Sequence, residues 1–388
     1  MSKYQLVTLG KHIDILSGCA FPSSGFNQQN GVPLIRIRDI LSGRTETYYE
    51  GSYDLKYLIK KGDLLVGMDG DFNREYWKGT DALLNQRVCK ITSNPETLDK
   101  NFLYHFLQKE LDKIHATTDV VTVKHLSVKK IQDIKIRLPS LKEQKRIAAI
   151  LDKADGIRQK REQAIKLADD FLRTKFLEMF YNEKIKRYPI TKVNDLLAQE
   201  KNSIRTGPFG SQLLHSEFTE SGIAVLGIDN AVKNEFQWGK PRFISQSKYE
   251  TLKRYTVFPG DVIITIMGTC GRCAVVPDNI PTAINTKHLC CISLDKSKCI
   301  PEFLHSYFLI HPLAKEYLAK HSKGAIMDGL NMGVIKHMPF PEFPLEQQYE
   351  FVNIKEKIKK LKIKLNSSKI DCEYKFTTLC NDIFNMQG

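Results

Sequence analysis

The sequence predicts a mixed α/β (α+β) fold that is built twice in tandem, with each globular unit followed by one long helix. Three observations indicate this fold class. The two halves of the chain resemble each other, β-rich runs alternate with one compact helical pattern in each half, and a long helix-forming segment closes each half. At 388 residues the chain also exceeds the usual size of a single domain core.

The internal similarity keeps its order and spacing through both halves. The paired segments are 31–40 with 222–231, 60–73 with 258–271, 84–91 with 284–292, and 102–107 with 303–308. Self-similarity at a fixed period indicates duplication of one structural unit. We therefore predict target-binding domains at 1–139 and 186–342, with helical regions at 140–185 and 343–388.

Each predicted globular domain combines strands with one helix. Short runs such as "PLIRIRDI" and "DVIITIM" have the length and β-branched content of strands. Gly62-Asp63 and Gly260-Asp261 stand just before apolar runs, where turn residues are expected. We expect one compact helix at 100–114 and its counterpart at 301–318.

The two long helices have separate start signals. Ser140 and Glu143 form the pattern of a capping box after Pro139, in which two residues satisfy each other's free backbone N–H groups. In the second copy Pro344 can occupy the first helical position, where its missing N–H costs nothing.

Both long helices carry an apolar stripe. Residues of this stripe recur mostly three or four positions apart, beginning with Ile147, Leu151, Ala154, Phe351, Ile354 and Ile358. A helix of about forty residues is roughly 60 Å long, and it cannot bury such a stripe alone. We predict that the two helices pair as an antiparallel coiled coil with pseudo-two-fold symmetry. The alternative is that both pack inside the core of one larger domain.

The charge balance favours an anionic partner. The chain has 58 Lys+Arg against 44 Asp+Glu, a formal net charge of +14, which suits nucleic acid or a membrane surface. The amino terminus has no apolar targeting segment and the longest apolar runs have strand length, so we expect a cytoplasmic protein without a membrane span. Nine irregularly spaced cysteines are typical of reduced thiols.

Common catalytic motifs are absent from the sequence. It has no G-x-x-x-x-G-K-[ST], no G-x-G-x-x-G after a strand, no H-E-x-x-H, no G-x-S-x-G and no Pro-Pro dipeptide of the kind found in amino-methyltransferase loops. Cys270-x-x-Cys273 is the best metal candidate, but the adjacent Cys290 and Cys291 make a poor second ligand pair, which favours buried thiols over zinc. We therefore predict no metal, no cofactor of its own and no catalysis.

With these features the chain resembles the specificity (S) subunit of Type I restriction–modification systems over nearly its whole length. The most specific segments are "LPSLKEQKRIAAILDKAD" and its echo "FPLEQQYEFVNIKEKI", together with "RTGPFGSQL" and "GDVIITIMGTCGR". The second helix opening departs from the first, since Gln347 stands for Glu143 and Glu350-Phe351 for Arg146-Ile147.

The resemblance implies a non-enzymatic subunit with two target recognition domains, each of which reads one half of a bipartite double-stranded DNA site. The conserved helices would set the spacer and dock two modification (methyltransferase) subunits, which carry S-adenosylmethionine. Restriction subunits would join to complete the nuclease. Lys and Arg contacts to phosphates would supply affinity, and a few loop side chains would read base edges.

The candidate DNA contacts lie on strands and in Gly-rich loops, where small residues allow close backbone approach. In the first domain they are Arg36, Arg38, Asn73, Arg74, Lys124 and His125. In the second domain they are Arg205, Thr206, Gly207, Phe209, Gly210, Ser211, Gln212, Thr269, Arg272, Lys287 and Asn331. The alternation of Arg36 and Arg38 with apolar residues predicts that both leave one strand face, toward DNA or into solvent with salt bridges. Gln212 has the amide needed for bidentate pairing with adenine.

The polar faces of the long helices are the predicted docking site for the modification subunits. The candidate residues are Lys145, Arg146, Arg158, Arg161, Lys359 and Lys362, and a solvated coiled-coil surface is the competing interpretation. Two other functions remain as alternatives: a coiled-coil scaffold that bridges two proteins without reading DNA, and a self-sufficient nuclease, which the absent motifs disfavour.

Overall fold

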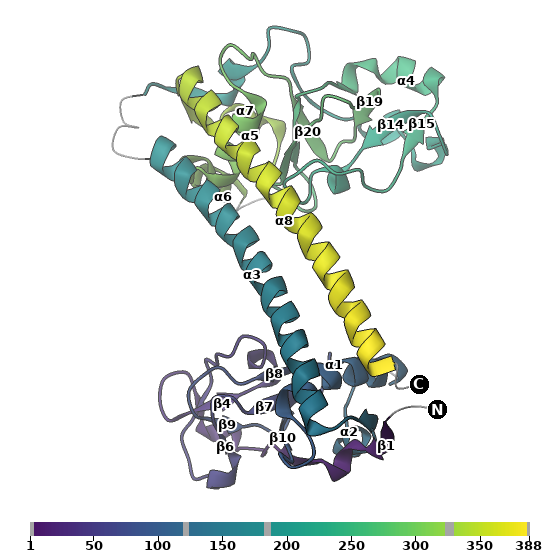
Figure 1. The fold of residues 1–388 in the computed structure, drawn as a ribbon. Helices are drawn as coiled ribbons and strands as arrows, with labels where there is room; N and C mark the ends of the chain where they lie inside the picture. The colour runs from purple at the N-terminus through teal and green to yellow at the C-terminus, as the bar shows by residue number, and fades with distance from the viewer. Residues whose placement is uncertain (1–3, 119–123, 182–187, 323–329, 386–388) are drawn as a thin grey trace. The chain divides into compact units, whose positions relative to one another are not determined.

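The computed structural model describes residues 4–118, 124–181, 188–322 and 330–385, and it divides the chain into two compact units. Unit 1 comprises Met1–Gln163 and Asn366–Gly388, and unit 2 comprises Ala164–Leu365. Each unit therefore contains one globular domain and a part of both long helices (Figure 1).

Unit 1 contains three sheets. A two-stranded sheet pairs β1 (Gln5–Thr8) with β11 (Lys135–Leu138), and a four-stranded sheet has the order β2 (Ile13–Ser17), β10 (Val88–Ser93), β7 (Leu64–Gly67), β8 (Arg74–Tyr76). A five-stranded sheet has the order β3 (Phe26–Asn27), β5 (Tyr48–Tyr49), β4 (Val32–Ile35), β9 (Ala82–Leu84), β6 (Leu58–Ile59). The helices are α1 (Lys100–Thr117) and α2 (Val128–Gln132). Only the β4–β9 pair among these described strands is parallel.

Unit 2 repeats this topology, except that β3 has no counterpart strand and is matched only by the isolated bridge between Thr219 and Phe243. Its sheets are β12 (Ile190–Lys192) with β21 (Pro339–Pro341); β13 (Ile204–Thr206), β20 (Leu289–Ile292), β17 (Val262–Thr265), β18 (Cys273–Val275); and β15 (Phe243–Ile244), β14 (Ile223–Leu226), β19 (Ala283–Asn285), β16 (Thr256–Val257). The parallel pair recurs as β14–β19. The helices are α4 (Gln246–Leu252), α5 (Pro301–Ile310), α6 (Pro312–Ser322) and α7 (Met332–Lys336). The shared strand order confirms the duplication.

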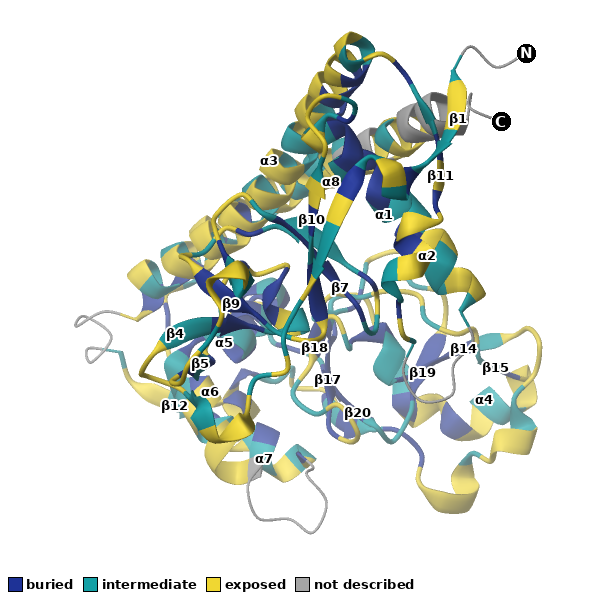
Figure 2. Ribbon diagram, turned by 90° about the horizontal axis from the view of Figure 1, so that it is seen from below, coloured by how far each residue is buried: buried dark blue, intermediate teal, exposed yellow. Residues whose placement is uncertain are grey.

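The compact helix of the second domain differs from the prediction. The segment expected as one helix is broken into α5 and α6, because Pro312 has no N–H to continue the hydrogen-bond ladder and His311 before it is extended. In unit 1 the corresponding helix α1 is continuous through Thr117. Strand β7 in unit 1 and strands β17 and β20 in unit 2 are buried along their whole length (Figure 2).

The long helices are α3 (Leu141–Phe180) and α8 (Leu345–Asn385), and both begin where predicted. The hydroxyl of Ser140 accepts a hydrogen bond from the backbone N–H of Glu143 at 3.4 Å. Pro344 lies one residue before α8, and its carbonyl accepts the N–H of Gln348 at 3.2 Å. Pro344 therefore occupies the N-cap position, one residue before the predicted first helical position.

A buried glutamine anchors each helix to its globular domain. In unit 1 the amide nitrogen of Gln144 donates to the carbonyls of Thr97 and Pro139 at 3.0 and 2.9 Å, and its oxygen accepts the N–H of Asp99 at 2.8 Å. Gln348 occupies the matching position in unit 2 and is equally buried. A buried amide that loses such partners costs about 1–3 kcal/mol, so these contacts fix the start of both helices.

Within unit 2 the two helices run antiparallel. The rings of Phe176 and Phe351 lie 5.0 Å apart, and Lys362 pairs with Asp169 at 2.5 Å. The contact that lies later on α3, at Phe176, therefore lies earlier on α8, at Phe351. Phe176 and Phe351 are fully buried together with Phe180 and belong to the unit's main hydrophobic core.

The same direction holds within unit 1. Arg161 of α3 donates to the backbone carbonyl of Ser368 on α8 at 3.0 Å. Earlier on α3, Ile147 and Leu151 are buried in the core against which Phe376 of α8 packs. The antiparallel helix pair is thus built from contacts inside each unit, and the globular cores are separate from each other.

Candidate nucleic-acid interface

Three loops of unit 2 meet at one edge of its four-stranded sheet. This loop edge of unit 2 comprises 206–212 after β13, 266–272 between β17 and β18, and 286–288 before β20. Backbone hydrogen bonds hold the last two together, since the N–H of Ile266 donates to the carbonyl of His288 at 2.9 Å. The edge brings together nine of the predicted contacts: Thr206, Gly207, Phe209, Gly210, Ser211, Gln212, Thr269, Arg272 and Lys287.

A glycine explains how the first of these loops is held. A Cβ on Gly207 would lie 2.1 Å from the carbonyl oxygen of Asn285, so only glycine allows the loop to cross the end of β19. Gly18 after β2 makes the same approach, 2.0 Å from the oxygen of Asn85, in unit 1. The duplicated close approach identifies the segment after Gly18 as the first domain's counterpart of the 206–212 loop.

The residues after Gly207 are presented to solvent. Phe209 is 48% exposed, and Ser211 and Gln212 are also exposed. Gly210 has a φ of +58° with open space at its Cβ position, where other residues are strained. The side-chain oxygen of Gln212 accepts from the hydroxyl of Tyr255 at 2.8 Å, so the predicted bidentate pairing with adenine requires this bond to be exchanged.

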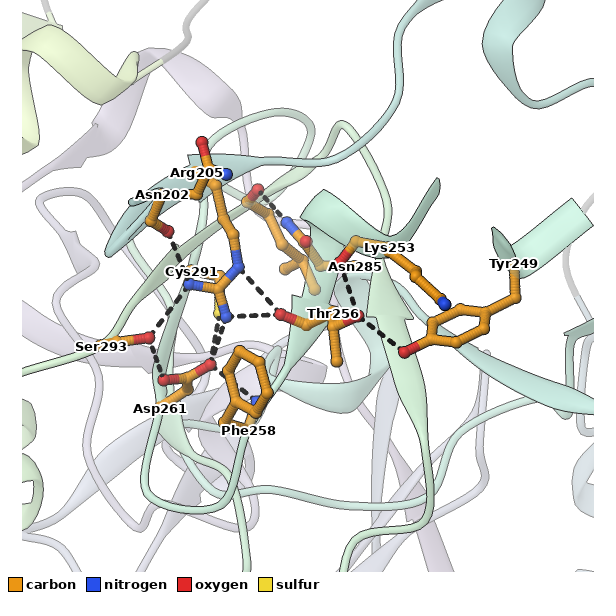
Figure 3. Close-up of polar contacts among 11 residues, drawn as sticks. Asn202, Arg205, Tyr249, Lys253, Thr256, Phe258, Asp261, Asn285, Cys291 and Ser293 are labelled. Atoms are coloured by element: carbon orange, nitrogen blue, oxygen red, sulfur yellow. Dashed lines mark hydrogen bonds and ion pairs between the residues drawn. The ribbon is translucent and has the colours of Figure 1, made fainter. Parts of the chain in front are cut away.

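Arg205 lies elsewhere than predicted. Its side chain is buried, and its guanidinium donates to the carbonyls of Thr256 and Asn202, to the hydroxyl of Ser293 and to the carboxylate of Asp261 at 2.5 Å (Figure 3). All of its donor groups are thus used inside the domain. Arg205 holds the sheet together and does not reach a DNA base, because the β13 position points into the space between the two sheets.

In unit 1 the carboxylate that corresponds to Asp261 is Asp63, and its cationic partner comes from a different strand. Asp63 pairs with Lys90 of β10 at 3.0 Å. Strand register matches Leu16 with Lys90 across β2–β10 and Arg205 with Cys291 across β13–β20. The cation has therefore moved from one strand to its neighbour between the two copies, while the carboxylate has stayed in place.

The loop edge of unit 1 comprises 18–25, 67–73 and 85–87, together with 124–125. Asp69 binds His125 at 2.6 Å and Arg87 at 3.1 Å, and both of these side chains are more than half exposed. The carboxylate of Asp69 is thus occupied by two side chains of the same loop edge. Lys124 donates to the carbonyl of His115 at the end of α1 at 2.5 Å.

Arg74 lies against the globular domain. Its guanidinium stacks 3.4 Å from the ring centre of Tyr104, and its backbone N–H donates to the side-chain oxygen of Gln108 at 3.2 Å. The neighbouring Asn73 closes the β7–β8 hairpin, since its carbonyl accepts the N–H of Gly67 at 2.9 Å. Asn73 is at the loop edge, whereas Arg74 begins β8.

Arg36 and Arg38 do not share a strand face. Strand β4 ends at Ile35, and Arg36 precedes a 3-10 turn in which its N–H donates to Asp39 at 2.8 Å. Its guanidinium lies 5.4 Å from the ring centre of Phe26, whereas Arg38 is largely exposed. The 3-10 turn breaks the alternation that the sequence pattern predicted.

Asn331 caps α7, because its side-chain oxygen accepts the N–H of Val334 at 2.9 Å.

Of the predicted docking residues, Arg146 and Arg158 pair with acidic residues three positions earlier on α3. Lys145 and Lys359 are exposed. Arg161 and Lys362 contact the other helix, as described above.

Sequence reasoning missed several residues at the loop edges. Arg87 and Gln86 in unit 1, His288 in unit 2 and the segment after Gly18 all lie there. The internal similarity pairs segment 84–91 with 284–292, so it indicates that both segments lie at a loop edge. Of these two segments, the predicted contacts include only Lys287.

The described cysteines on the sheet behave as buried thiols. Cys273 lies on β18 and Cys290 and Cys291 on β20, and burial raises the pKa of Cys290 to about 12. No group of three or more His, Cys, Asp or Glu suited to a metal ion occurs in the described part of the chain. Among the helices of the described ranges, none is both long and apolar enough to cross a membrane.

A duplicated sheet-rich unit, with a polar loop edge in each copy and an antiparallel helix pair, is the architecture of a two-domain recognition protein. The chain belongs to the family of the Type I restriction modification DNA specificity domain, whose model matches residues 1–167 and 210–372. The match covers both copies of the repeat, as the resemblance in the sequence implied.

Curated relatives and solved structures agree with this assignment. The EcoBI specificity subunit of Escherichia coli is 34% identical, with 89% of this chain and 77% of the relative covered. The MjaVIII specificity subunit of Methanocaldococcus jannaschii is 23% identical, with 75% and 71% covered. The S subunit of M. genitalium has a similar fold, with a TM-score of 0.59, 13% identity and 98% and 96% coverage. A chain from a structural study of type I R-M complex assembly has a TM-score of 0.55, 17% identity and 98% and 97% coverage.

Proposed function

We propose that this chain is the DNA sequence-recognition subunit of a Type I restriction–modification complex, and that each unit reads one half of a bipartite site. The observation that carries the proposal is the loop edge built twice on one scaffold with different side chains. Asn73 and Arg87 stand in unit 1 where Arg272 and His288 stand in unit 2, because their carbonyls accept equivalent backbone N–H groups of the two sheets. A shared scaffold with different loops suits two modules that read different base sequences.

The helix pair would set the distance between the half-sites. Each long helix of 40 or 41 residues is about 60 Å long at 1.5 Å per residue. Two modules on one face of a duplex favour half-sites about one helical turn, near 34 Å, apart. The spacer length would therefore follow the number of helical residues between the two units.

The modification subunits would dock on exposed apolar residues of the helices. Several large apolar side chains on α3 and α8 remain exposed within their own units: Ile150, Ile157, Leu167, Phe171, Leu361 and Ile363. Exposed apolar rows of this kind mark protein interfaces. The predicted basic residues would form the rim, since Arg146 and Arg158 are already paired along the helix. S-adenosylmethionine and the methyl-transfer chemistry would reside on the docked subunits, with no catalysis by this chain.

A loop exchange tests this function. The chain is coexpressed with its modification subunit, residues 206–212 are replaced by the corresponding loop of a relative, and methylated genomic DNA is read by single-molecule sequencing. One half of the methylated motif is expected to change while the other half stays the same. Unchanged methylation after the exchange contradicts the proposal. A scaffold that does not read DNA would also show no salt-dependent binding to duplex DNA.

A further inference from the structure

A pocket of about 330 Å³ lies beside the loop edge of unit 2. Its floor is formed by β14 (Ala224, Val225 and Leu226), and its opposite wall by the returning segment 238–243. Trp238 lines the pocket and is 59% exposed, an unusual position for the largest apolar side chain. The chain's second tryptophan, Trp77, is 2% exposed.

The wall that carries Trp238 is fixed in place. Asp229 accepts hydrogen bonds from the guanidinium of Arg242 at 2.5 Å and from the N–H of Lys240 at 2.8 Å. A Cβ on Gly239 would lie 1.9 Å from a carboxylate oxygen of Asp229, so the segment passes directly over this side chain. These contacts hold the tryptophan at the pocket, where Phe236 meets its ring at a centroid distance of 5.4 Å and more than half of the side chain stays exposed.

Hydrogen bonds connect the walls of the pocket to the loop edge. Leu226 lines the pocket, and its carbonyl accepts the N–H of Thr286 in the turn that carries Lys287, at 2.9 Å. The loop after β14 also reaches the β17–β18 hairpin, since the side chain of Asn234 accepts the N–H of Cys273 at 3.2 Å. The segments that line the pocket are therefore direct neighbours of two loops of the loop edge.

We propose that this pocket binds one unstacked nucleobase, with Trp238 as the stacking surface. The inference rests on the proposed function, because DNA on the loop edge is what brings a base within reach. An apolar floor, an exposed indole ring and the exposed Lys240 on the rim match a planar heteroaromatic ring attached to a phosphate chain. The volume is at the lower end of small-ligand pockets.

Tryptophan fluorescence of the full chain tests the proposal. The probes are a mixed-sequence single-stranded 12-mer, a duplex of the same sequence with one bulged base, and the fully paired duplex. The first two should quench emission, because stacking on Trp238 changes its environment while Trp77 stays buried. Trp238→Phe should abolish the quenching and keep the affinity within about threefold, whereas Trp238→Ala should weaken binding of the bulged duplex about 5- to 100-fold. Tyr349→Ala, an exposed aromatic residue on α8, is the matched control and should change neither readout.

Two outcomes separate this inference from the proposed function. If Trp238→Ala binds the bulged duplex and the 12-mer as tightly as the natural chain, or if saturating 12-mer leaves the emission unchanged, the pocket does not hold a base. In that case normal, salt-dependent binding of the paired duplex still supports the proposed function. Failure of the full chain to bind any duplex at low salt contradicts the proposed function itself.

Discussion

The buried ion pair of unit 2 can be converted into the charge arrangement of unit 1 by two substitutions. Arg205→Leu places the residue of unit 1's β2 at this position, since Leu16 is its counterpart. The change leaves the buried carboxylate of Asp261 without its cation. Removal of one partner of a buried pair costs about 3–5 kcal/mol, and the guanidinium's bonds to two carbonyls and a hydroxyl are lost as well.

A second substitution should recover part of this loss. Cys291→Lys reproduces Lys90 of unit 1, and the thiol of Cys291 already lies 3.2 Å from the carboxylate of Asp261. The double variant should therefore be more stable than Arg205→Leu by about 1.5–3 kcal/mol, the contribution of a hydrogen bond between charged groups. Cys291→Lys alone places two cations beside one carboxylate and should destabilise the unit.

Hydrogen exchange of the full chain, measured by mass spectrometry on peptides from β13 and β20, gives the opening free energy of this sheet for all four proteins. Peptides from unit 1 are the internal control and should not change. If the double variant opens more readily than Arg205→Leu alone, the equivalence of the two charge arrangements is wrong. An Arg205→Leu variant that loses less than about 1 kcal/mol would refute the structural role of the pair.

The remaining predictions concern the loop, the pH response and the helix anchor. Gly207→Ala should lower DNA affinity at least tenfold and destabilise unit 2, because the added Cβ would lie 2.1 Å from a backbone oxygen. The control Gly156→Ala has open space in α3, and it should stabilise the chain by about 0.5–1 kcal/mol in urea unfolding. Burial lowers the pKa of His305 to about 3 and that of Lys355 to about 8, so their unfolded forms bind more protons. Stability of unit 2 should therefore rise with pH from about 3 to 6.5 and again from about 8 to 10.5, and Lys355→Met should remove the second rise. Gln348→Leu should cost about 1–3 kcal/mol, because two carbonyls and one N–H lose their partner; retention of full stability would contradict this anchor.

Much of the fold follows from the repeat and from local signals in the sequence. The strands at 262–265 and 64–67, the helix starts near Ser140 and Pro344, and the antiparallel helix pair were all predictable, because each depends on patterns within a few residues or on self-similarity. The 3-10 turn after Ile35 was not, because alternation of arginine and isoleucine fits a strand until Asp39 caps the turn.

The site was harder to predict because tertiary contacts decide which polar residues remain exposed. Arg205 looks like a DNA contact beside a Gly-rich loop, yet Asp261, more than fifty residues away, draws it into the sheet. Conversely, the counterpart of the 206–212 loop in unit 1 is revealed only when Gly18 is seen to cross the end of β9. Charge alone would have missed this segment, which contains no Lys or Arg between Gly18 and Gly25.

The most direct test of the central claim is a change in helix length. Seven residues are inserted in both α3 and α8, at the paired positions near Arg161 and Ser368, and the methylated motif of the coexpressed complex is sequenced. Seven helical residues add about 10.5 Å, which corresponds to about three base pairs. The spacer should lengthen by about three base pairs while both half-sites keep their sequence. Methylation that persists with the original spacer would contradict the claim that the helices set the distance between two reading units.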